Sequence, residues 1–339
     1  MSATLRRLRG ANNEGLLVAV IIVVAVAMSI ASPAFLSSGT FFALVRSSMV
    51  PLIFALGVML IMISGGIDVS FPAIAIFAAY TTVRWSVDGN LDPGLVLVFV
   101  IAMVIGGLLG LFNGVVIARF RLPTLIVTLG TLTIYKGILL TYIGSLYISA
   151  SELPGSVTTL SDVHLWDAPG GGFLHFMIVP VVLVAVLIAL MLRWTLFGRS
   201  IFAIGGDTEA ARRVGIRVVR TQVWLYVLVG GLAAFGGMVF VILGKNANPQ
   251  SIVGTELDII AAVVLGGASI FGGRGSVFGT MLGVVLVQLI NNNLVLVGIP
   301  STWQRAVVGI LLLLGVTAQV LGRARAHKRP VMIEKEAEA

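Results

Sequence analysis

Long apolar stretches alternate with short polar or glycine-rich ones along nearly the whole chain. A helix of about 20 apolar residues crosses the hydrocarbon core of a bilayer, which is about 30 Å thick. The pattern therefore predicts an all-α integral membrane protein with about ten transmembrane helices. The predicted spans are Leu16–Ile30, Phe41–Ile63, Phe71–Val83, Gly94–Ile117, Thr124–Ile143, Phe176–Leu192, Val223–Leu243, Leu257–Ile270, Val277–Val297 and Trp303–Leu321.

One polar segment, Ser64-Gly65-Gly66-Ile67-Asp68-Val69-Ser70, lies between two strongly apolar runs. Irregular backbone at membrane depth is tolerated only where it is buried in protein or lines a water-filled cavity. The following run, Phe71–Val83, would rise only about 20 Å as a helix, too little for a straight crossing. We therefore expect a broken helix beside a transport path, with Ser70 as N-cap and Asp68 capping its second half.

Composition supports a membrane protein and excludes several other classes. Hydrophobic residues make up 58% of the 339 residues, charged residues only 11%, and the mean hydropathy is +1.08. A soluble domain would need far more surface charge, so 1–339 is expected to be one transmembrane domain in contact with lipid. The absence of cysteine excludes disulfides and thiolate metal sites. Ala31-Ser32-Pro33-Ala34 has features of a signal-peptide cleavage region, which leaves removal of the first span open.

The net charge of +8 is explained by the way the charged residues are distributed over the predicted membrane loops. Basic residues gather in the predicted loops on one side, whereas the opposite loops hold only Arg84 and Lys245 among several acids. By the positive-inside rule, both termini and the tail 322–339 are expected in the cytoplasm. No nucleic-acid partner is expected. The basic residues on the inner side are Arg6, Arg7, Arg9, Arg119, Arg121, Arg193, Arg199, Arg212, Arg213, Arg217, Arg220, Arg274, Arg323, Arg325, Lys328 and Arg329.

The cytoplasmic segment 193–220 is polar but shows internal order. A glycine turn leads to Thr208–Val214, which has the pattern of a short amphipathic helix that Asp207 or Thr208 can cap. A solvated basic loop is the alternative, but the order of turn, capped helix and glycine stop favours a docking element for a cytoplasmic partner. Its candidate residues are Gly198, Ala203, Gly205, Gly206, Asp207, Glu209, Ala210, Ala211, Arg212 and Gly215.

Glycines are also dense in Thr255–Gly279, where a second break and a tight turn are expected. Small residues four apart recur there and in Gly106–Gly114, which indicates close helix packing. Spans two to five start outside and spans seven to ten start inside, so the halves are expected to form an inverted repeat, a common transporter plan. The residues expected at structural breaks are Gly65, Gly66, Gly266, Gly267, Gly273 and Gly275.

Three motifs carry a family resemblance: Ser64–Ser70, Gly198–Ile216 and Glu256–Ser276. In order and spacing they resemble the permease subunits of bacterial ATP-driven (ABC) sugar importers of the ribose type, over about Phe41 to Leu321. The resemblance implies an inner-membrane permease paired with a second copy or homologue, with Ala203–Ile216 as the coupling helix. It also implies a cytoplasmic ATPase that binds Mg-ATP and a periplasmic or lipid-anchored sugar-binding protein.

The chain departs from that family at one point. The family commonly continues the first motif with valine-glycine-serine, whereas this chain has Phe71-Pro72-Ala73, which bears on the substrate. Branched-chain amino-acid permeases are distant relatives and remain an alternative. No Gly-x-x-x-x-Gly-Lys-Ser/Thr phosphate loop occurs, so no cofactor is expected in this chain and any ATP site must lie on another polypeptide.

Polar groups within spans are the candidates for lining a path, because each is costly unless protein, water or ligand satisfies it. Arg46 and Lys136 either line the route or lie nearer the outer boundary. A self-sufficient secondary transporter would need buried carboxylates, for which only Asp68 qualifies. A membrane enzyme lacks support, since no paired acids or His-Glu-x-x-His metal pattern occurs and no catalytic residue is expected. The pathway candidates are Asp68, Asn113, Thr128, Lys136, Gln288, Asn291, Asn292 and Asn293.

Overall fold

The computed structural model describes residues 14–169, 171–294, 300–304, 306–307, 309–310, 313 and 317, except for the side chains of Leu16 and Ser301. This part of the chain is mostly helical. Its longer helices are α2 (Glu14–Ala31), α3 (Ser38–Ile63), α4 (Phe71–Asp88), α5 (Leu95–Phe120), α6 (Thr124–Ile138), α8 (Ile178–Trp194), α9 (Leu196–Gly206), α11 (Val218–Gly244), α12 (Glu256–Leu265) and α13 (Val277–Asn293). The shorter elements are η1 (Pro33–Leu36), the π-helix η2 (Leu139–Ile143), α7 (Gly155–Ser161), β1 (His164–Asp167), β2 (Phe173–His175), α10 (Thr208–Arg213) and η4 (Ser301–Trp303).

Several helices are long and apolar enough to cross a membrane. Among the described residues, α3, α5, α6 with η2, and α11 meet this condition. Helices α8 and α9 together form one further candidate span, although they are bent by 73° relative to each other. The protein is therefore a helical, multi-pass membrane protein.

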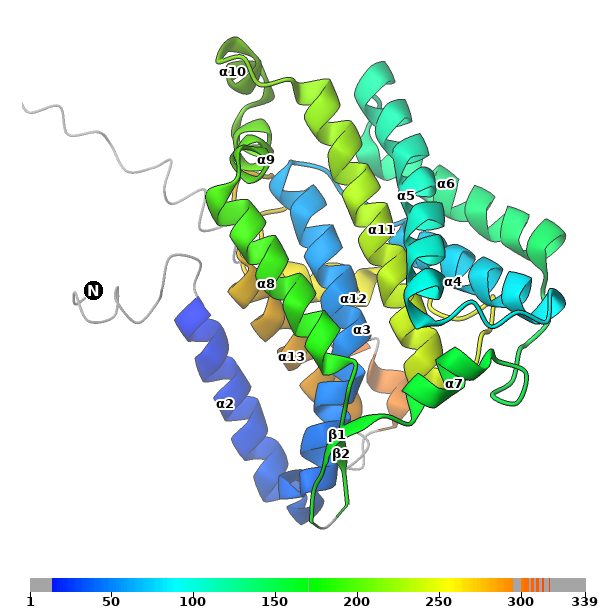
Figure 1. Ribbon diagram of the computed structural model, residues 1–339. Coiled ribbons are helices and arrows are strands. Elements are labelled where there is room, and N and C mark those ends of the chain that lie inside the picture. The colour runs from blue at the N-terminus through cyan, green and yellow to red at the C-terminus, as the bar shows by residue number, and fades with distance from the viewer. Residues whose placement is uncertain are drawn as a thin grey trace, which may run out of the picture.

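The core is built around α3 and α11, which lie next to each other in the middle of the molecule (Figure 1). Every residue of α3 from Leu52 to Ile63 is buried. Helix α3 is covered by other helices of the chain, because it packs against α8, α11, α12 and α13. Helix α5 runs along α11, and α2 packs against α13.

The contact between α5 and α11 is made by backbone. A Cβ at Gly110 would lie 2.1 Å from the carbonyl oxygen of Tyr226, and one at Gly106 would lie 2.4 Å from that of Gly230. Gly230 is equally restricted, because its Cβ would lie 2.2 Å from the Gly106 oxygen. The predicted close packing of small residues at Gly106–Gly114 is thus confirmed.

The two ends of the helical body carry different structures (Figure 1). Helix α10 and the end of α9 project at one end. The antiparallel hairpin of β1 and β2, together with α7, covers the opposite end. The segment predicted to dock a partner and the hairpin are therefore separated by the length of the membrane helices.

Some predicted spans have different bounds. Helix α4 continues past Val83 to Asp88. In this last part Arg84 and Asp88 form an ion pair at 2.8 Å, and the hydroxyls of Thr82 and Ser86 donate to carbonyl oxygens one turn earlier. Helix α12 ends at Leu265, earlier than the predicted span. Most of the tenth predicted span and the tail 322–339 lie outside the described residues.

Candidate functional site

Asp68 is buried in the irregular segment between α3 and α4. Its Oδ1 accepts hydrogen bonds from the backbone N–H and the hydroxyl of Ser70, both at 2.7 Å. Ser70 is the N-cap residue of α4 but makes no side-chain capping bond, because its hydroxyl is turned to Asp68. Asp68 therefore acts through Ser70, by fixing the turn from which α4 starts.

Asn113 of α5 and Tyr135 of α6 extend this cluster. The Nδ2 of Asn113 donates to the Ser70 hydroxyl oxygen at 2.9 Å. The Tyr135 hydroxyl lies 3.1 Å from Asn113 Oδ1 and 2.9 Å from the carbonyl oxygen of Leu109. The cluster thus joins the start of α4 to α5 and α6. Tyr135 is not among the pathway candidates that the sequence predicts.

Two threonines of α6 supply acceptors to the broken backbone. The N–H of Ile67 donates to Thr124 Oγ1 at 2.9 Å, and the N–H of Val69 donates to Thr128 Oγ1 at 3.3 Å. These N–H groups precede α4 and have no intrahelical carbonyl to bond. Gly65 has φ +88°, a backbone conformation that residues other than glycine rarely adopt. The break is therefore stabilised by protein groups from α6.

The other pathway candidates do not join this cluster. Lys136 is half-buried on α6, and within the described chain no hydrogen bond or ion pair connects it to Asp68. Gln288 is half-buried on α13. Both stay predictions as residues of the path.

The three asparagines at the end of α13 face different surroundings. Asn293 is buried and donates to the carbonyl oxygen of Leu289 in its own helix at 2.8 Å. Asn292 donates to the Ser47 hydroxyl of α3, and the backbone carbonyl of Asn291 accepts from Gln304 at 2.7 Å. The Oδ1 atoms of Asn291 and Asn293 are buried without a partner among the described residues.

The predicted docking segment folds as α9, a capped turn and α10. Asp207 Oδ1 accepts the N–H groups of Glu209 and Ala210 at 2.8 and 3.0 Å. The bonds from Ala210 and Glu209 hold the pKa of the Asp207 carboxyl below its ordinary value. Arg212 pairs with Glu209 at 3.0 Å, and Gly215, with φ +88°, follows the end of the helix.

The segment presents only part of its surface outward. Ala210 is exposed on α10, whereas Ala211 is buried against Ile204 and Val218. Ala211 therefore packs α10 onto its own chain and is not free to meet a partner. Gly198 lies at the bend from α8 into α9, where a Cβ would be 2.4 Å from the carbonyl oxygen of Met191. Ala203 is half-buried beside the same cluster.

The docking segment touches the broken helix directly. A Cβ at Gly205 would lie 1.7 Å from the carbonyl oxygen of Ile63, the last residue of α3. The Cβ position of Gly65 lies 3.7 Å from the Cα of Gly205. The N–H of Gly273 donates to the same Ile63 oxygen at 2.8 Å. Three glycine motifs that are far apart in the sequence therefore meet at the end of α3.

The second glycine-rich stretch forms the irregular connection between α12 and α13. Gly267 and Gly273 have φ +90° and +73°, respectively. A Cβ at Gly266 would lie 2.5 Å from the carbonyl oxygen of Gly279, and one at Gly275 would lie 2.7 Å from the Ile63 side chain. The connection thus packs against α13 and against the end of α3.

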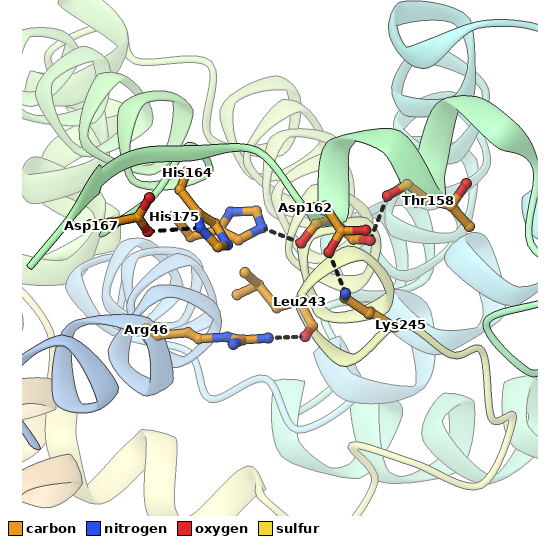
Figure 2. A network of polar contacts seen from close by, with 9 residues as sticks. Arg46, Thr158, Asp162, His164, Asp167, His175, Leu243 and Lys245 are labelled. Carbon is orange, nitrogen blue, oxygen red and sulfur yellow. Dashed lines mark hydrogen bonds and ion pairs between the residues drawn. The ribbon is translucent and has the colours of Figure 1, made fainter. Parts of the chain in front are cut away.

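A polar network at the hairpin end was not predicted from the sequence (Figure 2). Lys245, at the end of α11, pairs with Asp162, and Arg46 of α3 donates to the carbonyl oxygen of Leu243. Arg46 also lies 5.4 Å from the ring centroid of Phe173 in β2. Arg46 is therefore engaged with α11 and the hairpin. In the sequence, the only indication of this network was the presence of acids and Lys245 in the predicted outer loops.

His175 is the buried member of this network (Figure 2). Its Nδ1 accepts the N–H of Met177 at 3.1 Å, so Nε2 carries the proton and donates to the carbonyl oxygen of Ser161 at 3.2 Å. Burial lowers the pKa of the His175 imidazole from its ordinary value of 6.5, although the bond to Ser161 opposes this. The neutral ring thus joins the end of α7 to the start of α8.

Comparison with known proteins identifies the family. A family model described as the branched-chain amino acid transport system permease component matches residues 40–316. The chain belongs to this permease family. It is accordingly a transport subunit.

Its relatives include import permeases from several bacteria. The chain is 35% identical over 307 residues to the ribose import permease of Bacillus subtilis, covering 89% of each chain. It is 32% identical over 302 residues to the autoinducer 2 import system permease of Yersinia enterocolitica, covering 89% of this chain and 81% of the relative. No solved structure matches the chain.

Proposed function

We propose that this chain is the membrane permease of an ATP-driven importer that moves a monosaccharide or related polyol by alternating access. The curated relatives are named for ribose and autoinducer 2, which favours this cargo over a branched-chain amino acid. The observation that carries the mechanism is the contact of Gly205 with the carbonyl group of Ile63. Through it, a force on α10 would reach the break without passing through flexible side chains.

The proposal includes an orientation and a set of partners. The α9–α10 end faces the cytoplasm and a Mg-ATP-binding ATPase, while the hairpin end faces a periplasmic or lipid-anchored binding protein. A second copy or a homologue completes the pathway. The arginines around α10 support this orientation. A ten-span fold with inverted repeats remains part of the proposal.

In the proposed cycle, nucleotide binding by the partner moves α10 and α9. Because Gly205 and Gly273 both meet Ile63, the end of α3 moves with them. The cluster of Asp68, Ser70 and Asn113 then carries the motion to α4 and α5. Only differential contacts in the two states can shift such an equilibrium.

Reconstitution into proteoliposomes tests the proposal. The permease together with its ATPase and binding protein should accumulate a sugar only when ATP is supplied. The permease alone should neither hydrolyse ATP nor accumulate sugar. Uptake by the permease alone, driven by an ion gradient, would instead establish a secondary transporter.

A further inference from the structure

An apolar groove of about 590 Å³ lies between α5 and α11 at the surface of the described chain. Gly107 adds no side chain to it, and much of its wall is exposed, as Leu108 at 60% and Val104 at 55% show. Exposed apolar surface of this kind is covered by lipid or by another protein. The side chains along the groove include Val100, Val104, Leu108, Leu111, Trp224 and Val227.

Two arginines lie beyond one end of the groove, on the faces that border it. Leu108, Val115 and Arg119 follow one another at spacings of seven and four, so they lie along one exposed face of α5. Arg220 is exposed on α11 and precedes Trp224 by four residues, which is about one turn. The apolar faces of both helices therefore end in a guanidinium group.

The two arginines lie at similar depth. The antiparallel helices meet where a Cβ at Gly114 would lie 3.0 Å from the Cα of Val223. Arg119 follows Gly114 by about 7.5 Å along α5, and Arg220 precedes Val223 by about 4.5 Å along α11. Both displacements point to the same end of the helix pair, so the two Cα levels differ by only about 3 Å.

Neither arginine has an acidic partner in the described protein. Helices α5 and α11 contain no aspartate or glutamate, and the ion pairs of the described chain do not include Arg119 or Arg220. Guanidinium groups bind phosphate through pairs of N–H donors. The ligand that fits this end of the groove is therefore an anion with a phosphate group.

The dimensions fit one phospholipid in one leaflet. The groove extends along α5 from Val100 to Leu111, which is about 16 Å, and Arg220 lies about 6 Å beyond Trp224. Their sum of about 22 Å is half the thickness of a bilayer with its headgroups. Trp224 is 56% exposed between the groove and Arg220, and tryptophan is typical of the boundary between headgroups and hydrocarbon.

We propose that the groove binds an anionic phospholipid, with an acyl chain between α5 and α11 and the phosphate between Arg119 and Arg220. The arginines lie at the end of the body that carries α10, so the proposed orientation places this lipid in the cytoplasmic leaflet (Figure 1). The lipid site goes beyond the proposed function and does not depend on the transported solute.

Quenching of tryptophan fluorescence tests the site, because bromine on an acyl chain quenches a tryptophan that it touches. The full-length permease is reconstituted in bilayers of equal amounts of phosphatidylglycerol and phosphatidylethanolamine, with brominated chains on one lipid or on the other. The difference between the wild type and Trp224→Phe isolates Trp224 from the other tryptophans among the five in the chain. Both bilayers have the same charge, so the comparison reports only which lipid lies against Trp224.

Phosphatidylglycerol should occupy the groove about 25-fold more readily than phosphatidylethanolamine, because each of the two arginines contributes about a fivefold gain for an anionic lipid. Brominated phosphatidylglycerol should therefore quench most of the Trp224 signal, and brominated phosphatidylethanolamine little of it. Equal quenching by the two would show ordinary surrounding lipid and overturn the site. Quenching by neither would show that protein, such as a second copy of the chain, covers the groove, which also overturns it.

Arg119→Gln and Arg220→Gln test the headgroup end. Each should lower the preference for phosphatidylglycerol about fivefold. Arg193→Gln, at an exposed arginine in the last turn of α8, makes the same change of charge away from the groove and should leave the preference unchanged. A preference that survives in both Arg119→Gln and Arg220→Gln would overturn the assignment of the phosphate to these arginines.

Gly107→Leu tests the acyl-chain part of the site. A Cβ at Gly107 comes no closer than 3.7 Å to Val227, an ordinary contact, so the added side chain fills the groove without forcing the helices apart. Quenching of Trp224 by brominated phosphatidylglycerol should fall to the level given by phosphatidylethanolamine. Gly130→Leu on α6, with no described atom near its Cβ position, is the control. Unchanged quenching in Gly107→Leu with a wild-type melting temperature would overturn the groove as the place of the chain.

Discussion

Gly205 in α9 rests on the carbonyl group of Ile63 at the end of α3, and a Cβ there would lie 1.7 Å from the oxygen. Any side chain must therefore displace backbone, which cannot be relieved by rotamer changes. The same oxygen already accepts the N–H of Gly273 at 2.8 Å. The end of α3 is thus held between the docking segment and the turn before α13.

Gly205→Ala is expected to uncouple transport. The added methyl group pushes α9 away from α3, and such overpacking costs about 1–3 kcal/mol. Sugar uptake by the complete importer should fall by at least about tenfold, the equivalent of 1.4 kcal/mol. Membrane insertion should persist, because the long apolar helices are unchanged. Uptake in vesicles and the melting temperature of the purified permease measure the two effects.

Gly206→Ala is the matched control for the melting temperature. A Cβ at Gly206 would meet no atom of the described chain within 4 Å, so stability should not fall. If Gly205→Ala transported as well as the wild type, the contact with Ile63 would have no part in coupling.

Asp68→Asn distinguishes a structural carboxylate from an ion-coupling one. The amide oxygen can still accept both bonds from Ser70, although bonds to a neutral acceptor are about half as strong. Uptake should therefore persist within a few-fold, whereas Asp68→Leu removes the acceptor and should abolish folding or transport. Uptake assays with both variants, beside the amount of protein in the membrane, provide the measurement. Loss of uptake in well-folded Asp68→Asn would favour ion coupling through this carboxylate.

The break and the docking segment could be predicted because their residues are unusual for their surroundings. Paired glycines, Asp68 and Ser70 stand out in a run of apolar residues, and Asp207 before Thr208 is a common helix start. The pattern also predicted that Asp68 serves the start of α4. It could not show that Asp68 acts through the Ser70 hydroxyl, because one carboxylate can satisfy several neighbouring groups.

The meeting of Gly205, Gly273 and Ile63 could not be predicted. It depends on the bend of 73° between α8 and α9 and on how α12 and α13 pack against α3. Neither the bend nor this helix packing can be read from the spacing of residues along the chain. The network around His175 was missed for the same reason, since its members come from α3, the hairpin and the end of α11. The predicted end of α4 at Val83 was wrong, because the hydropathy pattern stops at the first charge, whereas Arg84 and Asp88 lie within the helix and pair with each other.

Gly110→Ala should weaken the packing of α5 on α11. The methyl group would collide with the backbone at Tyr226, and the resulting strain should lower the free energy of unfolding by about 1–3 kcal/mol. Gly130→Ala, at a glycine of α6 with no described atom near its Cβ position, should be neutral or slightly stabilising in the isolated permease. Thermal unfolding in detergent compares the pair, and equal melting temperatures would contradict the close contact.

His175 should make the hairpin end sensitive to acid. Protonation would place a donor at Nδ1 against the N–H of Met177 and add a positive charge near Arg46, His164 and Lys245, with Asp162 as the facing acid. The pKa of His175 is lower in the folded protein than its ordinary value of 6.5, so the unfolded chain takes up the proton first as pH falls. The stability that the neutral ring contributes is therefore complete above pH 6.5 and is lost as pH falls through and below that value.

The prediction is a fall in melting temperature between about pH 7 and 5, before most carboxylates titrate. One proton contributes at most about 1.4 kcal/mol per pH unit, so the change should be gradual. His175→Gln can keep an acceptor for Met177 and a donor for Ser161 but cannot titrate in this range. Its melting temperature should vary less over the same interval. Parallel profiles for the wild type and His175→Gln would show that other groups set the acid sensitivity.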